Sequence, residues 1–201
     1  MKILSALLLA LLLAAPARAA APLGPEVAIM QIRFPKEKQP RQVIIGLHDE
    51  SAPYTVANFK KLIQKKFYNG LRFHRAFPGS LLQTGDPSSR WGQGDTTGTG
   101  GPGWTLPAEI RLKHEKGSLA MARLPDPINP AKNSNGSQFY VCLDPMPKLN
   151  GQYTVFGTIL EGLDVLDEIS RAPTNSNDFP LPKITIKSIV LAPRESAPAT
   201  R

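Results

Sequence analysis

The sequence contains only one cysteine, Cys142, so no disulfide bond can form within the chain. Cys142 lies in the apolar run from 139 to 143, where a buried thiol is far more common than a reactive one. We therefore predict that Cys142 belongs to the hydrophobic core and does not act as a nucleophile.

Histidine is also scarce, which argues against metal and hydrolase chemistry. The three histidines, His48, His74 and His114, show no metal-ligand spacing, so we expect no metal site. No Ser/His/Asp arrangement typical of a serine hydrolase is recognisable either. His74 precedes Arg75 on an alternating segment, so the two side chains should point to opposite faces of a strand. We expect His74 to be a structural, hydrogen-bonded residue.

Acidic residues are fewer than basic ones, 16 against 24, and the formal net charge is +8. Lys2 and Arg18 carry two of these positive charges, which leaves +6 on the rest of the chain. The basic residues are scattered along the sequence, and the four lysines between 60 and 66 fit the solvated face of one helix. We predict no binding to nucleic acid.

The N-terminal apolar run is shorter than the roughly 20 residues that cross a membrane. Lys2 precedes the apolar residues 3–15, and Ala17-Arg18-Ala19 forms an A-x-A cleavage site. We predict a cleaved signal peptide at 1–19, a linker at 20–26, and export to a periplasm or to the medium. After cleavage we expect no stable membrane span, and an uncleaved anchor is the alternative.

Helix-breaking residues are abundant, with 20 prolines and 16 glycines among 201 residues, which favours short strands joined by turns. The sequence is 41% hydrophobic, which is enough for one well-packed domain. We predict that this domain spans 27–192 and that a disordered tail follows at 193–201. Apolar alternation and turn residues indicate eight strands. These are 27–34, 42–47, 71–77, 80–84, 118–123, 138–143, 154–160 and 183–191.

Two helices are expected between these strands. Ser51-Ala52-Pro53 is a helix-start signal, and Val56, Phe59, Ile63 and Phe67 recur at helical spacing up to Asn69-Gly70. A second, shorter helix is indicated by the apolar spacing between 163 and 169. Eight strands without regular strand–helix alternation favour a closed antiparallel barrel or a sandwich, and periodicity does not choose between them.

Several ordered motifs resemble the cyclophilin family of peptidyl-prolyl cis/trans isomerases. They are FHRAFPG at 73–79, GTGGPG at 98–103, SLAMAR at 118–123, NGSQFYV at 135–141 and GQYTVFGTILEGLDVLDEI at 151–169. Any one of them would be weak support, but their combination and order are specific.

The resemblance implies a mainly β fold, a closed eight-stranded antiparallel barrel capped by two α-helices. It also implies an enzyme that rotates Xaa-Pro bonds. Together with the signal pattern at 1–19, this predicts an isomerase that assists the folding of exported proteins and needs no cofactor. The expected partners are proline-containing unfolded or extended polypeptides, and the protein is expected to be a monomer. The alternative is a weakly active or inactive peptide-binding module of the same fold.

The resemblance also assigns roles to individual residues. Arg75 matches the catalytic arginine, whose planar fork of donors reaches the proline carbonyl and the isomerising amide. Gln83 and Gln138 match two glutamines beside it, one expected to hold Arg75 and the other the substrate backbone. The further substrate-binding positions are Ser80, Leu81, Gly98, Ala122, Arg123, Tyr140, Lys148, Leu149 and Tyr153. Among these, Leu81, Tyr140 and Leu149 match the proline pocket, and Ala122 and Arg123 match an edge that pairs with the substrate backbone.

Four features depart from the family pattern. Ser80 replaces a residue that is usually large and apolar, so one wall of the proline pocket should be shallower. Lys148 stands where Trp is frequent, and Tyr153 stands where His is frequent. The segment 124–134 is longer than in many relatives and could reshape one end of the groove.

Overall fold

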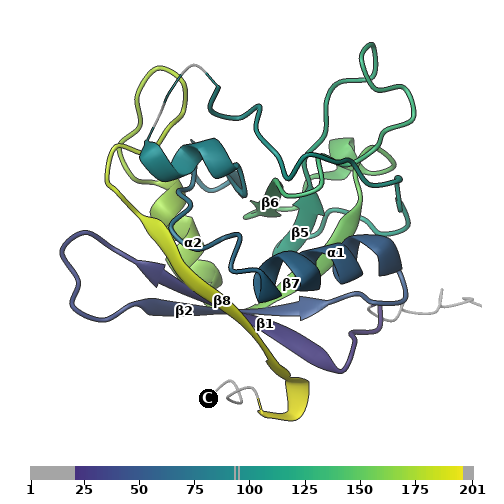
Figure 1. The fold of residues 1–201 in the computed structure, drawn as a ribbon, viewed down its shortest axis with the longest axis horizontal. Coiled ribbons are helices and arrows are strands. Elements are labelled where there is room, and N and C mark those ends of the chain that lie inside the picture. Colours follow the sequence, from purple (N-terminus) through teal and green to yellow (C-terminus); the bar gives the residue numbers. More distant parts are fainter. Residues whose placement is uncertain (1–20, 93, 95, 197–201) are drawn as a thin grey trace, which may run out of the picture.

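A single eight-stranded sheet dominates the computed structural model, which describes residues 21–92, 94 and 96–196 (Figure 1). The strands follow one another in the order β3-β4-β6-β5-β7-β2-β1-β8, and every pair is antiparallel. Their bounds are β1 Glu26–Arg33, β2 Arg41–Leu47, β3 Arg75–Phe77, β4 Leu81–Thr84, β5 Ser118–Met121, β6 Phe139–Cys142, β7 Val155–Glu161 and β8 Thr185–Pro193. Each predicted strand is confirmed, with ends that differ by a few residues.

The expectation of a fully closed barrel is wrong, because the sheet curls into a barrel that its two edge strands do not close. Strand β3 is only three residues long, and its Ala76 N–H donates to Asp178 O at 2.9 Å rather than to a strand. The segment before β3 approaches β8 instead, through an isolated bridge between Arg72 and Thr185. A loop therefore covers part of the edge that a longer β3 would have paired with β8.

The core inside the curled sheet is centred on an aromatic cluster of Phe59, Tyr68, Phe139 and Phe156. These rings lie 5.2–6.2 Å apart and are tilted or edge-on to one another, which is the favoured aromatic geometry. All four side chains are at most 1% exposed. They join helix α1 (Pro53–Gln64) and the turn after it to strands β6 and β7.

A second, smaller apolar cluster lies on the opposite face of the same strands. It contains Ala120, Tyr140, Cys142 and Val155, so β6 buries residues on both faces. Cys142 is fully buried, as predicted, and burial raises the pKa of its thiol to about 12. The thiol therefore stays protonated and unreactive near neutral pH.

Helix α1 (Pro53–Gln64) packs against β8, and its buried face includes Val56, Phe59 and Ile63 as predicted. The helix ends earlier than predicted, because Lys66 takes a positive φ of 54°. The N–H of Lys66 donates to Ile63 O, and the N–H of Phe67 donates to Leu62 O, which is a Schellman termination. Phe67 is therefore beyond the helix, and it is only partly buried.

Helix α2 (Leu163–Ser170) covers strands β2, β3 and β4 through Leu166 and Ile169. Three short 3₁₀ turns complete the fold, η1 (Pro87–Trp91), η2 (Pro147–Leu149) and η3 (Arg194–Ser196). No helix in the described part of the chain is long and apolar enough to span a bilayer.

The predicted ends of the domain are only partly within the described residues. The predicted signal peptide at 1–19 lies outside them. At the other end, β8 includes Pro193 and η3 follows, so residues 193–196 have regular structure and not the disorder predicted for them. Arg194 explains this, because its N–H donates to Pro25 O and its guanidinium to Leu23 O. Residues 197–201 of the predicted tail lie outside the described part.

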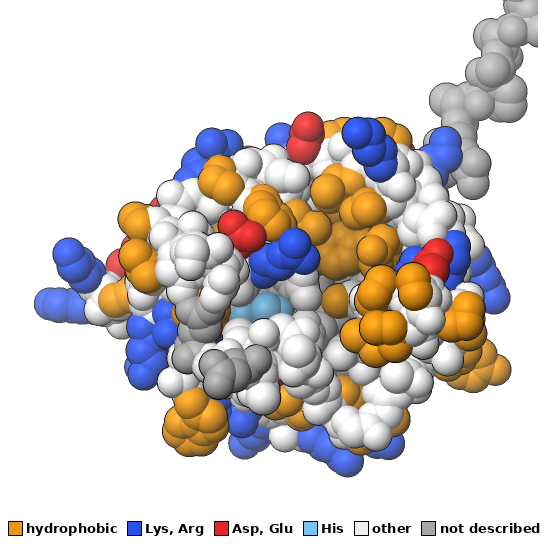
Figure 2. Space-filling model, turned by 90° about the horizontal axis from the view of Figure 1, so that it is seen from above, with side chains coloured by type: hydrophobic (Ala, Val, Ile, Leu, Met, Phe, Trp, Pro, Cys, Tyr) orange, Lys and Arg blue, Asp and Glu red, His pale blue; other side chains and the backbone are white. Residues whose placement is uncertain are grey.

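Charged side chains do not gather into one patch on the face in Figure 2. Most Lys and Arg side chains lie around the margin of this face, one basic group lies near its centre, and hydrophobic side chains lie around a hollow. An extended basic surface of the kind that tracks a phosphate backbone is not seen on this face.

Gly85 provides a test of how tightly β4 joins the segment before β6. Its φ is +92°, and a Cβ there would meet Ser137 O at 2.3 Å. We expect Gly85→Ala to lower the free energy of unfolding by about 2 kcal/mol or more, because both strain and a backbone clash are introduced. Urea denaturation measures this change.

Gly103 is a matched control, since its φ is +97° and a Cβ there would contact nothing within 4 Å. Gly103→Ala should cost only the backbone strain, roughly 1 kcal/mol. Equal losses for the two variants would contradict the close packing of Gly85 against Ser137.

Candidate active site

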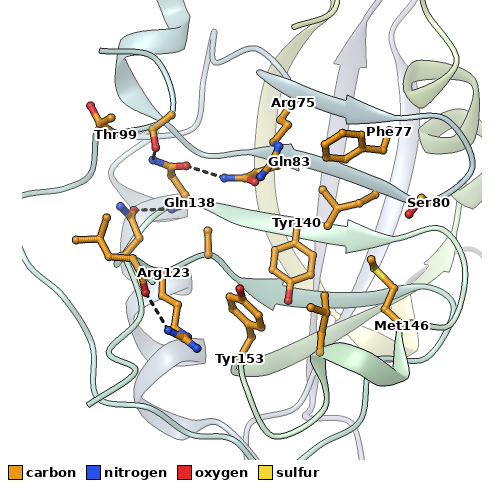
Figure 3. A pocket seen from close by; sticks show the side chains of 16 residues that line it. Arg75, Phe77, Ser80, Gln83, Thr99, Arg123, Gln138, Tyr140, Met146 and Tyr153 are labelled. Atoms are coloured by element: carbon orange, nitrogen blue, oxygen red, sulfur yellow. Dashed lines mark hydrogen bonds between the residues drawn. The ribbon is translucent and has the colours of Figure 1, made fainter. Parts of the chain in front are cut away.

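The predicted site residues gather around one cavity of about 380 Å³ on the outer face of strands β3, β4, β6 and β5 (Figure 3). Eleven of the twelve line it, and only Lys148 does not. Lys148 lies in η2 with an exposed side chain. Sequence reasoning missed five lining residues, Phe77, Thr99, Leu124, Asn135 and Met146.

Strand register explains why these side chains share one face. Arg75 pairs with Gln83, Gln83 with Tyr140, and Tyr140 with Ala120, which forms one row across four strands. Residues directly opposite in antiparallel strands point to the same face. The catalytic candidate therefore stands at one end of a row whose other members form the floor.

Arg75 has an exposed side chain that is held by an aromatic ring. Its guanidinium carbon lies 4.7 Å from the centre of the Phe77 ring, within the range of a cation–π interaction. It forms no ion pair or hydrogen bond with any described residue, so the donors of the guanidinium stay available. Arg75 therefore does not have the ordinary structural role of a surface arginine, because no described carboxylate pairs with it.

Gln83 and Gln138 bind each other, and neither binds Arg75. Gln83 Nε2 donates to Gln138 Oε1 at 2.9 Å, while Gln138 Nε2 donates to Gly98 O at 3.0 Å and to Gly100 O at 2.7 Å. The expectation that one glutamine holds Arg75 is therefore wrong in this structure, because Phe77 makes that contact. The glutamines instead fix the glycine-rich loop that borders the cavity.

The same loop is held from beneath by Asp86, which is fully buried. Its carboxylate accepts hydrogen bonds from the backbone N–H groups of Gly98 and Gly100 and from Ser88. Gly98 has a φ of +92°, a conformation that residues with a Cβ rarely adopt. The loop therefore presents its backbone to the cavity in one defined position.

Tyr140 and Tyr153 form an aromatic floor, with ring centres 5.7 Å apart and planes nearly perpendicular. Tyr140 is 3% exposed, and its hydroxyl lies 2.9 Å from His114 Nε2. Burial raises the pKa of Tyr140 and lowers the pKa of His114, so both groups are neutral near pH 7. The floor therefore offers a neutral aromatic surface rather than an acid or base.

Ser80 does not leave this part of the cavity without an apolar wall, because Phe77 lines the cavity next to it. Ser80 is the last residue of the β3–β4 turn, and in Figure 3 the Phe77 ring lies between Arg75 and Ser80. Met146 and Leu81 line the same cavity. The large apolar side chain that position 80 lacks is thus present two residues after Arg75, on the same face of β3.

The Arg123 side chain is only 5% exposed and serves the protein's own structure. Its Nε donates to Gln152 O at 2.7 Å, its Nη1 donates to Leu124 O at 2.9 Å and pairs with Asp126 at 2.6 Å. The guanidinium also lies 4.8 Å from the centre of the Tyr153 ring. Arg123 therefore joins two loops at this end of the cavity.

The backbone at 122–123 is only partly free to pair with a peptide. Ala122 N–H donates to Gln138 O, and Ala122 O accepts from Asn135 N–H, so both groups are already used. The N–H and C=O of Arg123 have no hydrogen bond within the described part of the chain. The edge predicted from Ala122 and Arg123 is thus reduced to Arg123.

Known proteins resemble this chain in both sequence and structure. The family model described as cyclophilin type peptidyl-prolyl cis-trans isomerase/CLD matches residues 31–191. Peptidyl-prolyl cis-trans isomerase B of Bacillus subtilis is 43% identical over 128 residues, which cover 62% of this chain and 80% of the relative. An isomerase of Helicobacter pylori is 40% identical over 134 residues, which cover 64% of this chain and 74% of the relative. A Cryptosporidium parvum cyclophilin solved in the presence of the dipeptide Ala-Pro has a TM-score of 0.69 and 28% identity, covering 83% of this chain and 98% of that one.

His74 lies beneath the cavity and is 5% exposed, with neither ring nitrogen hydrogen-bonded to a described residue. It is buried as expected. Burial lowers its pKa to about 4, although the nearby Asp86 and Gln138 act in the opposite direction. At pH values between about 4 and roughly 6.5, the pKa of an exposed histidine, the unfolded chain binds more protons than the folded chain.

The stability contributed by neutral, buried His74 should therefore be complete above about pH 6.5 and should fall as the pH drops towards 4. The full effect is roughly 3 kcal/mol. His74→Phe keeps a planar ring and removes the titrating group, so the variant should lose less stability than wild type between pH 7.5 and 5. Urea denaturation across this range measures both slopes, and parallel slopes would show that His74 does not contribute.

Proposed function

Since the chain belongs to the cyclophilin-type family and is a peptidyl-prolyl cis-trans isomerase, we propose that Arg75 is its catalytic residue in this cavity. The proposal depends on the surroundings of the Arg75 guanidinium. It lies beside an apolar cavity, it rests on Phe77, and no described group neutralises it. A cation kept free of internal partners is able to bind a substrate carbonyl or amide.

The reaction itself explains why such a group is sufficient. Rotation about a peptide bond is opposed by C–N double-bond character, with a barrier of about 18–20 kcal/mol, and no covalent bond breaks. In the twisted state the nitrogen regains a lone pair, which a fixed donor stabilises more than it stabilises the planar ground state. The proposal therefore requires neither a cofactor nor a general base.

The second requirement is an apolar slot for the proline ring. Leu81, Leu149, Met146 and the ring of Tyr140 line the cavity on the side of the floor. Burying the pyrrolidine against these side chains would fix the position of the isomerising bond relative to Arg75. The free backbone groups of Arg123 would then hold the substrate chain beside this slot.

A weakly active peptide-binding module would result if Ser80 left the proline pocket without an apolar wall. Phe77 and Met146 line the cavity near this residue, so the absence of a large side chain at position 80 does not leave the pocket without an apolar wall. This arrangement supports an active isomerase over the alternative.

We further propose that the enzyme acts as a monomer on extended, proline-containing segments of exported proteins. Support for export comes from the signal pattern at 1–19, which lies outside the described residues. The intact mass of the protein recovered from a periplasm or culture medium tests it. A product that begins at Ala20 agrees with cleavage, and a product that retains Met1 contradicts it.

Replacing Arg75 tests the proposed mechanism. We expect Arg75→Ala to reduce kcat/KM on short Xaa-Pro peptides by about 10²–10³, the usual cost of removing one preorganised donor. Protease-coupled or exchange kinetics measure the loss. Arg111→Ala is the control, because Arg111 is exposed and lies outside the cavity, and it should keep wild-type rates. Equal rates for all three proteins would exclude Arg75 as the catalytic group.

Replacing Phe77 tests whether it substitutes for the missing side chain at position 80. Phe77→Ala should lower kcat/KM about tenfold, because it removes both the cation–π support of Arg75 and an apolar wall. Ser80→Phe should then restore much of the rate in the Phe77→Ala background. In the wild-type background the same change should raise the rate little, and a large gain there would show that Ser80 limits turnover.

A further inference from the structure

The segment 124–134, which begins at the cavity, places two large apolar side chains in solvent. Leu124 is 57% exposed and Ile128 is 69% exposed, and Leu124 also lines the cavity itself. We call these two residues the apolar rim. Exposed apolar side chains that adjoin a binding cavity are typical of surfaces that bind other molecules.

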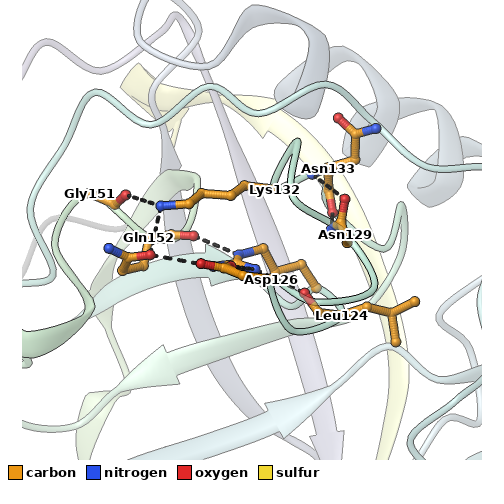
Figure 4. Close-up of polar contacts among 8 residues, drawn as sticks. Leu124, Asp126, Asn129, Lys132, Asn133, Gly151 and Gln152 are labelled. Carbon is orange, nitrogen blue, oxygen red and sulfur yellow. Dashed lines mark hydrogen bonds and ion pairs between the residues drawn. The ribbon is translucent and has the colours of Figure 1, made fainter.

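The segment that carries the apolar rim is held by polar contacts along its length (Figure 4). At its start, Arg123 binds the backbone of Leu124 and the carboxylate of Asp126. Near its end, Lys132 Nζ donates to Gln152 Oε1 at 2.7 Å and to Gly151 O at 3.3 Å.

A local ring closes the turn between these two anchor points. Asn129 Nδ2 donates to Asn133 O at 2.8 Å, and Asn133 N–H donates to Asn129 Oδ1 at 3.1 Å. The N–H groups of Ile128 and Asn129 both donate to Pro125 O at 3.0 Å. Because the backbone is fixed on both sides of Ile128, a ligand that binds the rim would lose little free energy in ordering the segment.

The backbone next to the rim indicates what kind of ligand fits it. The N–H and C=O of Arg123 have no hydrogen bond within the described part of the chain, and Leu124 is the next residue. An extended polypeptide that pairs with these groups would continue along the segment and direct alternate side chains towards it. One polypeptide would thereby occupy the cavity and the rim together.

We propose that the apolar rim binds an apolar side chain of the same polypeptide whose proline occupies the cavity, within about three residues of that proline. The inference rests on the proposed function, and it adds a preference for clients in which a large apolar residue flanks the Xaa-Pro bond. Such sequences are buried in folded proteins and exposed in unfolded ones, which would direct the enzyme to unfolded chains.

The test uses two matched peptide sets around one Xaa-Pro bond. In one set, a single Leu occupies one of the three positions before or the three positions after the proline. In the other set, Ser occupies the same position. Dissociation constants are measured by fluorescence anisotropy, and isomerisation is measured on the same peptides. Wild type, the double variant Leu124→Ser/Ile128→Ser and the control Leu181→Ser are compared. Leu181 is 59% exposed and does not line the cavity, so it matches the rim in chemistry but not in place.

We expect wild type to bind the peptide with Leu at one of these positions about tenfold more tightly than its Ser counterpart. The double variant should lose this preference, and the control should keep it. The absence of a Leu preference in wild type, or its persistence in the double variant, would overturn the proposal.

Two further measurements distinguish peptide binding at the rim from catalysis and from self-association. A wild-type protein that binds the peptides with the Leu preference but fails to isomerise them would contradict the proposed function and leave the rim supported. Sedimentation velocity on the free proteins addresses a second copy of the chain as the occupant. A wild-type dimer that the double substitution converts to a monomer would overturn the proposal in favour of self-association.

Discussion

Burial of β6 on both faces is the constraint on which the fold and the site jointly depend. Successive residues of a strand point to opposite faces, so Phe139 enters the aromatic core while Tyr140 enters the floor of the cavity. A shift of one residue in register would exchange them, placing a phenol hydroxyl in the core and removing the floor. The packing that stabilises the sheet therefore also sets the position of the substrate cavity.

Much of the fold was predictable from the sequence, because its signals are local. Alternation of apolar residues identified all eight strands, and helical spacing identified both helices. What failed depends on distant partners. Closure of the barrel was overestimated because Ala76 pairs with Asp178, and the order of residues 193–196 depends on Arg194 reaching Leu23 and Pro25. Periodicity within a segment carries no information about such contacts.

In the site, as in the fold, the residues within motifs were predictable, and the contacts between different segments were not. Eleven predicted residues meet around the cavity, because the motifs that contain them occupy neighbouring strands. Motif matching assigned the support of Arg75 to a glutamine, whereas Phe77 makes this contact. Phe77 could have been found from its place two residues after Arg75, since that spacing puts both on one face of a strand. The contacts that Arg123 and Ala122 make within the protein could not be predicted, because they depend on the surrounding loops.

The burial of Cys142 has a consequence for the environments in which this protein is able to persist. Its thiol is inaccessible and remains protonated at physiological pH, so it is protected from oxidants and from exchange with other thiols. The fold contains no disulfide bond that a reductant could break, because Cys142 is the only cysteine in the sequence. Its stability should therefore not depend on the thiol–disulfide balance of its surroundings.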